Sequence, residues 1–386
     1  MVITSAPGKI LWIGGYSVLE QPNTSLVGAI NKRVYVKVKE NNSKNFKIES
    51  KQLNEKWEGN LENEKLDSPL NFVYQALKCT INFLNYNKVN TKGIVIQTYS
   101  DSAFSIEGGK SGLGSSAAVT TATVASILEY FEGGYVQKKD IIHKIAQVAH
   151  SLAQGKVGSG FDVAACTYGS CIYSRYDPKI IENKNSSQIQ ELVNSQWDYS
   201  IKPIKLPEEF RLAFGNFILQ SAKTSDMVRK VMELKKNSNE EYKKIISKIN
   251  LENEKSIVFL KQYENASDDN TKKEYLIEFL ISFNNARILT KQLGILSGTE
   301  IESDLATQLI EESKKHGAFV CKLPGAGGMD SIVALCKNEE AKNQLEEFWK
   351  KYLKLKILPI DLENEMDGIK LESEAEFIIN KSRYNF

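Results

Sequence analysis

A run of glycine and serine residues places the strongest constraint on how this chain folds. Residues 108–118 read GGKSGLGSSAA and lead into small and apolar residues that predict a helix. Glycines let backbone N–H groups approach an anion without interference from a Cβ, serines supply hydroxyls, and the following helix directs the positive end of its dipole at the loop. The run therefore predicts a cradle for nucleotide phosphates.

The run departs from two other phosphate-binding patterns. A Walker loop needs a lysine directly after its last glycine, whereas Ser115 follows Gly114 here. A dinucleotide fingerprint needs GxGxxG and a suitably placed acidic residue downstream, and this segment has neither. An isolated GLGSS is equally typical of an ordinary loop with a serine at a helix N-terminus, so the rest of the chain has to decide.

Two further glycine-bearing segments accompany the run. Residues 6–20 read APGKILWIGGYSVLE, and residues 323–330 read LPGAGGMD. With 108–118 between them, they resemble, in order, the three signatures of the kinases named for galactose, homoserine, mevalonate and phosphomevalonate, the GHMP kinases. Within that superfamily, residues 149–164, AHSLAQGKVGSGFDVA, and the KTS at 223–225 resemble the phosphomevalonate kinases of the fungal, plant and bacterial type.

This resemblance implies an α+β fold with two domains. Residues 1–190 are expected to form an N-terminal domain like domain 2 of ribosomal protein S5, carrying the phosphate loop. Residues 205–386 are expected to form a ferredoxin-like C-terminal domain. The chain itself agrees, because 386 residues are long for one hydrophobic core and the polar stretch 179–207 makes the best boundary.

Hydrophobic periodicity predicts the elements around the motifs. Strands are expected at 2–4 and 10–13 around a Pro7-Gly8 turn, at 34–39, 94–96, 210–220, 319–321 and 331–335, with a hairpin or surface excursion at 41–68. Helices are expected after Pro69, from Ser115 to before Gly133, over 141–152 and over 226–296. A helix stopping at Gly155 places Lys156 to Asp162 in the loop beyond it.

The resemblance implies ATP-dependent phosphorylation of (R)-5-phosphomevalonate to (R)-5-diphosphomevalonate plus ADP, in the mevalonate pathway of isoprenoid biosynthesis. A phosphate acceptor has a second pKa near 6 and is mostly dianionic at pH 7, so a general base is dispensable. The site must instead cancel charge between anions. The candidate cations are Lys9, Lys110, Lys156 and Lys223, with Arg229 equally typical of a helix surface.

Site residues follow from the matched motifs. Catalytic roles are expected for Lys9, Lys110 and Asp162, and Asp162 is expected to orient Lys9 and the substrate, or else to cap a turn or helix. The ATP-binding set is Lys110, Gly112, Leu113, Gly114, Ser115 and Ser116. The substrate-binding set is Lys9, Ser17, Ser159, Gly160, Lys223, Ser225 and Gly327.

Mg²⁺ is the expected metal, and Ser116 is its expected protein ligand. Mevalonate kinases supply a second ligand, a glutamate, at the position that corresponds to Ser151 here. A serine offers no carboxylate, so phosphate oxygens and water are expected to complete the metal shell.

The composition does not favour binding to nucleic acid or insertion into a membrane. Fifty basic and 48 acidic residues give a net charge of +2, which predicts no nucleic-acid binding, and no apolar run approaches the roughly 18 residues of a membrane span. The five cysteines form no CxxC pair, and His143, His150 and His316 have no ligand spacing, so structural roles and a cytoplasmic location are expected. The only expected partner is the small-molecule substrate, and the oligomeric state stays open.

Two alternatives to the expected activity stay open. In the first alternative, the chain is another GHMP-superfamily enzyme, such as mevalonate kinase or a decarboxylase. In the second, it is a regulator that binds a nucleotide and catalyses no reaction. Lys9, Asp162 and the three glycine loops argue against the regulator.

Overall fold

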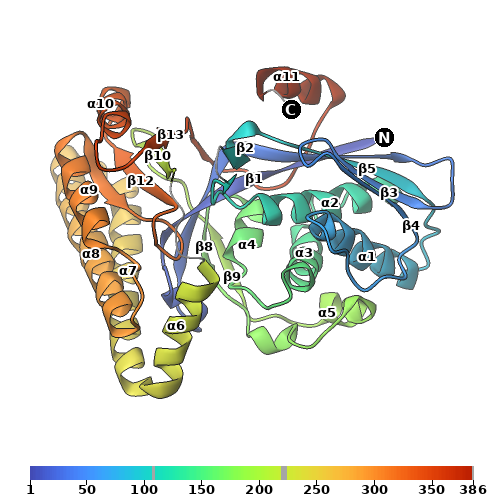
Figure 1. Cartoon of the computed structure of the whole chain (residues 1–386), viewed down its shortest axis with the longest axis horizontal. Coiled ribbons are helices and arrows are strands. Elements are labelled where there is room, and N and C mark those ends of the chain that lie inside the picture. Colours follow the sequence, from blue (N-terminus) through green and yellow to red (C-terminus); the bar gives the residue numbers. More distant parts are fainter. Residues whose placement is uncertain (107–108, 219–223, 385–386) are drawn as a thin grey trace.

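The computed structural model describes residues 1–106, 109–218 and 224–384. Within them two sheets, each with its own helices, lie side by side (Figure 1). Mixed helix and sheet content in two such units is the expected α+β organisation. No helix in these ranges is long and apolar enough to cross a membrane.

The first sheet has nine strands among the described residues, and its main path runs β15-β1-β2-β5-β3-β4. β3 runs parallel to β5, whereas β1 and β2 form a long antiparallel pair. The strands are β1 (Val2–Ile13), β2 (Ser25–Glu40), β3 (Phe46–Ser50), β4 (Glu55–Gly59), β5 (Ile94–Ser100), β8 (Cys171–Ser174), β9 (Ser200–Pro203), β14 (Asn364–Glu365) and β15 (Lys370–Leu371). A separate short pair joins β6 (Ser105–Ile106) to β7 (Gly109–Lys110).

Helices cover both faces of the first sheet (Figure 1). On one face lie α1 (Asn71–Tyr86), α2 (Ser115–Phe131), α3 (Lys139–Gln154) and α4 (Phe161–Tyr168), and on the other lies α11 (Glu374–Tyr384). The small side chains of α2 are buried on almost every side, as befits a central helix that packs against α1, α3 and the sheet. Short elements connect these parts: α5 (Ile189–Asn194) and the 3₁₀ turns η1 (Ser17–Leu19), η2 (Ser102–Phe104), η3 (Pro178–Ile180) and η4 (Ser186–Gln188).

The second sheet is antiparallel and has the order β11-β12-β10-β13. Its strands are β10 (Arg211–Phe217), β11 (Ala318–Lys322), β12 (Ser331–Cys336) and β13 (Ile357–Pro359). Its helices are α6 (Thr224–Asn237), α7 (Asn239–Asn265), α8 (Asp269–Leu296), α9 (Asp304–Lys315) and α10 (Glu339–Lys350). Leu212 and Phe214 join the main core with residues of α7 and α8, while Ala213 and Phe217 join a second core with α9 and α10, as the two-residue period of a strand requires.

Three expectations need correction. The segments 2–4 and 10–13 belong to the single strand β1, which passes Pro7-Gly8 with a bulge rather than a turn. Asp162 lies in the first turn of α4, not in the loop that precedes it. Residues 364–371, placed by sequence in the second half, pair with β1 and β2 of the first sheet, so the chain crosses back near its end.

Candidate active site

The predicted phosphate loop packs against strand β1 at Lys9. The Lys9 backbone N–H donates to the carbonyl of Leu113 over 2.8 Å, and its ammonium Nζ donates to the carbonyl of Gly112, also over 2.8 Å. A Cβ on Gly8 would lie 3.0 Å from the Leu113 oxygen and 2.9 Å from the Phe104 ring. The bulge and the missing side chain at Gly8 therefore allow the loop to approach the strand closely.

Two glycines give the loop its path. Gly112 has φ +73° and Gly114 has φ +88°, a region that side-chain-bearing residues rarely adopt. Helix α2 starts directly afterwards at Ser115, so the first N–H groups of a long helix face the end of the loop. Leu113, which is buried, anchors the turn between the two glycines.

Lys9 runs directly beside Gly114. A Cβ added at Gly114 would lie 2.8 Å from Lys9 Cε and 3.1 Å from Cγ. Burial is the main influence on the Lys9 ammonium and lowers its pKa below the usual 10.5, while the Asp162 carboxylate acts in the opposite direction. The Phe161 ring lies 5.8 Å from Nζ and adds a cation–π contact.

Ser116, Asp162 and His150 form a small polar cluster at the start of α2 and α4. His150 Nε2 lies 3.2 Å from Ser116 Oγ and 4.0 Å from Asp162 Oδ2. Burial lowers the pKa of His150, so the ring is neutral at physiological pH and contributes hydrogen bonds rather than charge. Ser116 and Asp162, the hydroxyl and the carboxylate expected at the site, therefore both lie close to His150.

A cavity of about 240 Å³ opens beside Lys9 and Phe161, and Ser116, His150 and Asp162 are not among the residues that line it. Lys9, Gly112, Ser159 and Phe161 line it from the first unit, and the third glycine loop closes it from the second unit through Gly325 to Gly327. Its volume lies below the roughly 300 Å³ at which pockets for drug-sized ligands begin, and therefore suits a small metabolite.

Two hydrogen bonds hold the third glycine loop against the first motif. The Tyr16 hydroxyl donates to the Ala326 carbonyl over 2.8 Å, and Lys322 Nζ donates to the Trp12 carbonyl over 3.1 Å. Gly327 approaches Ile301 so closely that a Cβ would lie 2.3 Å from the Ile301 oxygen. The glycine segments near residues 14, 112 and 326 therefore meet around one cavity, although they are far apart in the sequence.

The remaining predicted residues lie at varying distances from this centre. Ser159 and Gly327 line the cavity, and Gly160 precedes α4 with its carbonyl bonded to Gln147. Ser17 is fully buried with its hydroxyl bonded to Asn253, whereas Ser225 and Lys156 are exposed. Arg229 pairs with Glu233 on α6. Lys223 and the side chain of Lys110 lie outside the described residues.

Sequence reasoning missed three contributors. His150 was expected to be structural, and it is buried, but it also contacts Ser116 and Asp162. Phe161 and Tyr16 line the cavity. All three stand inside the motif segments 6–20 and 149–164, so their position beside the matched residues was the available signal.

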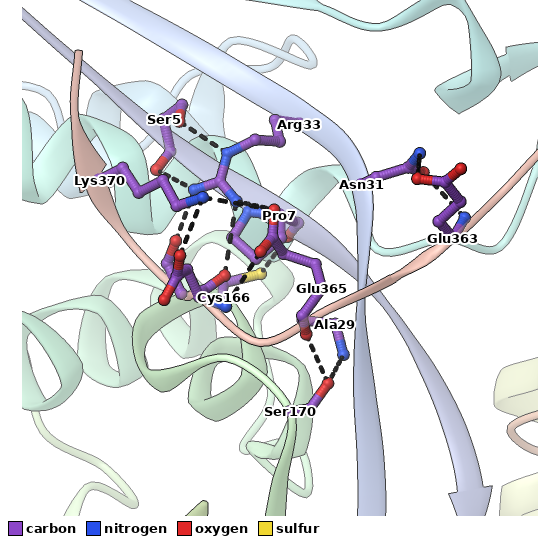
Figure 2. Close-up of polar contacts among 12 residues, drawn as sticks. Ser5, Pro7, Ala29, Asn31, Arg33, Cys166, Ser170, Glu363, Glu365 and Lys370 are labelled. Carbon is purple, nitrogen blue, oxygen red and sulfur yellow. Dashed lines mark hydrogen bonds and ion pairs between the residues drawn. The ribbon is translucent and has the colours of Figure 1, made fainter. Parts of the chain in front are cut away.

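A strap formed by residues 363–372 supports the helix that carries Asp162 (Figure 2). The buried Arg33 of β2 donates to Ser5 Oγ over 2.7 Å and to the carbonyl of Gly368, and it lies 3.7 Å from the Glu365 carboxylate. Ser170 Oγ, just beyond α4, donates to the Glu365 carbonyl over 2.7 Å. The end of α4 is thus fixed between β2 and the strap.

At the same helix, the Cys166 thiol donates to the Pro7 carbonyl over 3.1 Å (Figure 2). Pro7 stands two residues before Lys9 on β1. Asp162 and Lys9 are therefore held by a common framework in which α4 is bonded to the strand on one side and to the strap on the other.

The side chains at this site could supply only a few ligands to a metal ion, which suits a metal that is bound mainly by the phosphates of a nucleotide. In the described part of the chain, no three His, Cys, Asp or Glu side chains gather closely enough to hold a metal ion. The oxygen donors of the site include the Ser116 hydroxyl and the Asp162 carboxylate, and Ser159 and Asp330 line the cavity. Mg²⁺ keeps several waters and takes one or two protein ligands beside phosphate oxygens, so these residues fit it.

Comparison with known proteins agrees with this geometry. Residues 71–170 match the model of the GHMP kinases N terminal domain, and residues 280–355 match that of the GHMP kinases C terminal domain. A phosphomevalonate kinase of Saccharolobus solfataricus is 31% identical over 97% of this chain and 100% of its own length. The chain belongs to the GHMP kinase family, among the phosphomevalonate kinases.

Other relatives of this family support the assignment. A phosphomevalonate kinase of Candida albicans is 28% identical and covers 97% of this chain and 98% of its own length. Among solved structures, Streptococcus pneumoniae phosphomevalonate kinase in complex with phosphomevalonate and AMPPNP superimposes with a TM-score of 0.74. It is 21% identical and covers 95% of this chain and 100% of that one, which supports the two-domain GHMP kinase fold.

Proposed function

We propose that this protein transfers the γ-phosphoryl group of ATP to the phosphate of (R)-5-phosphomevalonate, giving (R)-5-diphosphomevalonate and ADP in the mevalonate pathway. The observation that carries the proposal is the position of Lys9. Its ammonium group bonds to the Gly112 carbonyl, and Lys9 and Gly112 line the same cavity as Gly325 to Gly327 of the third glycine loop. A cation placed there neutralises charge where donor and acceptor phosphates approach each other.

The reaction needs no proton transfer to begin. An oxygen of the acceptor phosphate dianion attacks the γ-phosphorus, a new P–O bond forms, and the bond from the γ-phosphorus to the β–γ bridging oxygen breaks to release ADP. The protein has to bring three mutually repelling groups together: the triphosphate, the acceptor phosphate and the acceptor carboxylate. Catalysis then rests on positioning and on electrostatic stabilisation.

Each element of the site has a part in this scheme. The N–H groups at the start of α2 receive the nucleotide phosphates, and Lys9 stabilises the charge that develops between γ-phosphate and acceptor. Asp162 orients Lys9, with His150 fixing the geometry as a neutral partner. Ser116 and Asp162 are the residues that would hold Mg²⁺, which supplies further charge neutralisation on the phosphates.

An acceptor comparison tests the proposed activity. ADP release is measured with ATP and, separately, mevalonate, 5-phosphomevalonate and 5-diphosphomevalonate. Turnover with 5-phosphomevalonate alone is the expected result. Turnover with mevalonate alone would assign the alternative activity of a mevalonate kinase, CO₂ release from the diphosphate would assign a decarboxylase, and nucleotide binding without turnover would assign a regulator.

The role of Asp162 has its own test. If Asp162 orients Lys9, the Asp162→Asn protein loses activity by roughly one to two orders of magnitude, and the shape of its pH profile stays that of the wild type. A loss of about four orders of magnitude, together with a wild-type rate that rises through one acidic group, would instead assign base catalysis to this carboxylate.

The same proposal places the reaction in the cytoplasm. All five cysteines are free thiols, which persist in a reducing compartment. Cell fractionation with an antibody against the chain tests this location, and recovery with organelles or secreted material would contradict it.

A further inference from the structure

Helices α7 and α8 carry apolar side chains on the face that points away from the core. The two helices form a long antiparallel hairpin at the side of the molecule opposite α1 to α4 (Figure 1). Six aliphatic side chains on this hairpin, here called the outer stripe, are between 43% and 72% exposed: Leu251, Val258, Ile277, Ile281, Ile288 and Ile295. At 100° per residue they lie opposite the buried residues of their own helices, such as Leu260 and Phe279.

The exposed side of α8 lacks charge over its second half. From Ile281 to Leu296, a segment that is described throughout, the exposed residues are Ile281, Asn285, Ile288, Gln292, Ile295 and Leu296. The two cations in this segment are partly shielded and paired, Arg287 with Glu311 and Lys291 with Asp304. The exposed side of α7 carries several lysines and glutamates, as a solvated helix does. Depletion of charge from an apolar face is typical of the centre of a protein interface.

The stripe is continuous across both helices. Ser256 bonds to Ser282, and Glu252 bonds to Asn285, which sets the register of the antiparallel pair. In this register Leu251 stands beside Ile288 and Val258 beside Ile281. One surface groove of about 300 Å³ is lined by the apolar Leu251, Ile288 and Leu289 together with Lys248, Glu252 and Asn285.

We propose that the outer stripe is the interface of a symmetric homodimer, in which α8 of one copy packs antiparallel to α8 of a second copy. The spacing of the isoleucines favours a second copy of the same chain as the partner. Ile281, Ile288 and Ile295 recur every seven residues and are symmetric about Ile288. A two-fold axis at Ile288 therefore places Ile281 of each copy against the partner subunit's Ile295, and Ile288 against the partner subunit's Ile288.

The exposed area agrees with this interface. At roughly 150 Å² for a fully exposed aliphatic side chain, the outer stripe presents about 500 Å² per copy. A standard interface buries about 800 Å² per partner, so the stripe and the uncharged residues between its members would supply most of it. The face lies away from the catalytic cavity, and the inference goes beyond the proposed activity.

The first test measures the oligomeric state of the purified full-length chain by sedimentation velocity and light scattering over a wide concentration range. The wild type is expected to be a dimer, and Ile288→Glu, which places two like charges at the axis, is expected to be a monomer. Leu353→Glu is the matched control, because Leu353 is 100% exposed and lies outside the stripe. Circular dichroism and kinase activity check that both variants remain folded.

A cross-linking test reads the symmetry directly. All five native cysteines are buried, so a cysteine introduced on the surface provides the accessible thiol. Ile288→Cys is expected to form a covalent dimer under mild oxidation, because the two thiols meet at the axis. Ile281→Cys and Ile295→Cys alone are expected to cross-link poorly, and an equal mixture of the two is expected to cross-link well.

Three results would overturn the proposal: a monomeric wild type at all concentrations, a dimer that persists unchanged in Ile288→Glu, or equal cross-linking of all single-cysteine variants. The second of these would assign dimerisation to another face. None of them depends on which acceptor the enzyme uses, so the proposed activity and the interface stand or fall separately.

Discussion

Gly114 offers a direct test of how Lys9 is positioned. Gly114→Ala adds one methyl group whose carbon would lie 2.8 Å from Lys9 Cε. Non-bonded carbons normally approach to about 3.5–4.0 Å, so the lysine chain has to move by roughly 0.7 Å or more. The substitution therefore displaces the ammonium group without removing it.

The size of the effect follows from two contributions. A misplacement of about 1 Å at a catalytic group costs roughly 100-fold in rate, so we expect kcat to fall about 30- to 100-fold. A residue with a Cβ at positive φ also strains the backbone by about 1–2 kcal/mol, which lowers thermal stability. Only the first contribution depends on Lys9.

Gly112→Ala is the matched control for this prediction. Gly112 belongs to the same loop and also has positive φ, but a Cβ there would have no atom within 4 Å. The Gly112→Ala variant therefore has the same kind of backbone strain as Gly114→Ala but does not displace the Lys9 side chain. Steady-state kinetics with both substrates saturating, and thermal denaturation of both variants, separate the two contributions. Equal losses of kcat in the two variants, or a Gly114→Ala enzyme with wild-type kcat, would refute the assigned position of Lys9.

Three further outcomes follow from the buried charges. Burial lowers the pKa of Lys322 from 10.5 to about 8, so its charged form costs stability below pH 8 and the cost is relieved as pH rises toward 10.5. The wild type should gain up to about 3 kcal/mol relative to Lys322→Met between pH 7 and 10 in denaturant titrations, and parallel pH profiles of the two would contradict this. Arg33→Gln should destabilise the fold by about 2–4 kcal/mol because the carbonyls of Ser5 and Gly368 lose their buried donor, and a change under 1 kcal/mol in urea titrations would show that the strap contributes little. Because burial lowers the pKa of Lys9 in the free protein, kcat/KM should fall on the alkaline side at a lower pH than for an exposed lysine, whereas Lys9→Arg should keep its reduced kcat/KM unchanged over that range.

Local signals in the sequence were sufficient for most elements. The glycine and serine run predicted a loop that leads into a helix, and Gly112 and Gly114 adopt positive φ directly before α2 begins at Ser115, whereas phosphate binding by this loop stays a prediction. The apolar face over 141–152 predicted α3, and Gly155 ends it in the left-handed conformation. These features depend on residues a few positions apart, and such short-range rules can be read from the chain directly.

Features that depend on distant residues could not be read in this way. Pro7-Gly8 looked like a turn, yet β2 and the phosphate loop hold it inside a bulged strand. The strap at 363–372 crosses back because Arg33, buried in β2, has its acceptors there. Nothing near residue 365 in the sequence indicates that partner.

The three glycine segments, together with Lys9 and Asp162, were sufficient to recognise the family from the sequence alone. Only the tertiary structure decided that these segments meet around one cavity, that His150 joins Ser116 to Asp162, and that α8 presents an uncharged apolar face to solvent. The physical reason is one of range: backbone conformation and helical periodicity are set by neighbouring residues, whereas the burial and charge environment of a side chain are set by whichever distant segments pack against it.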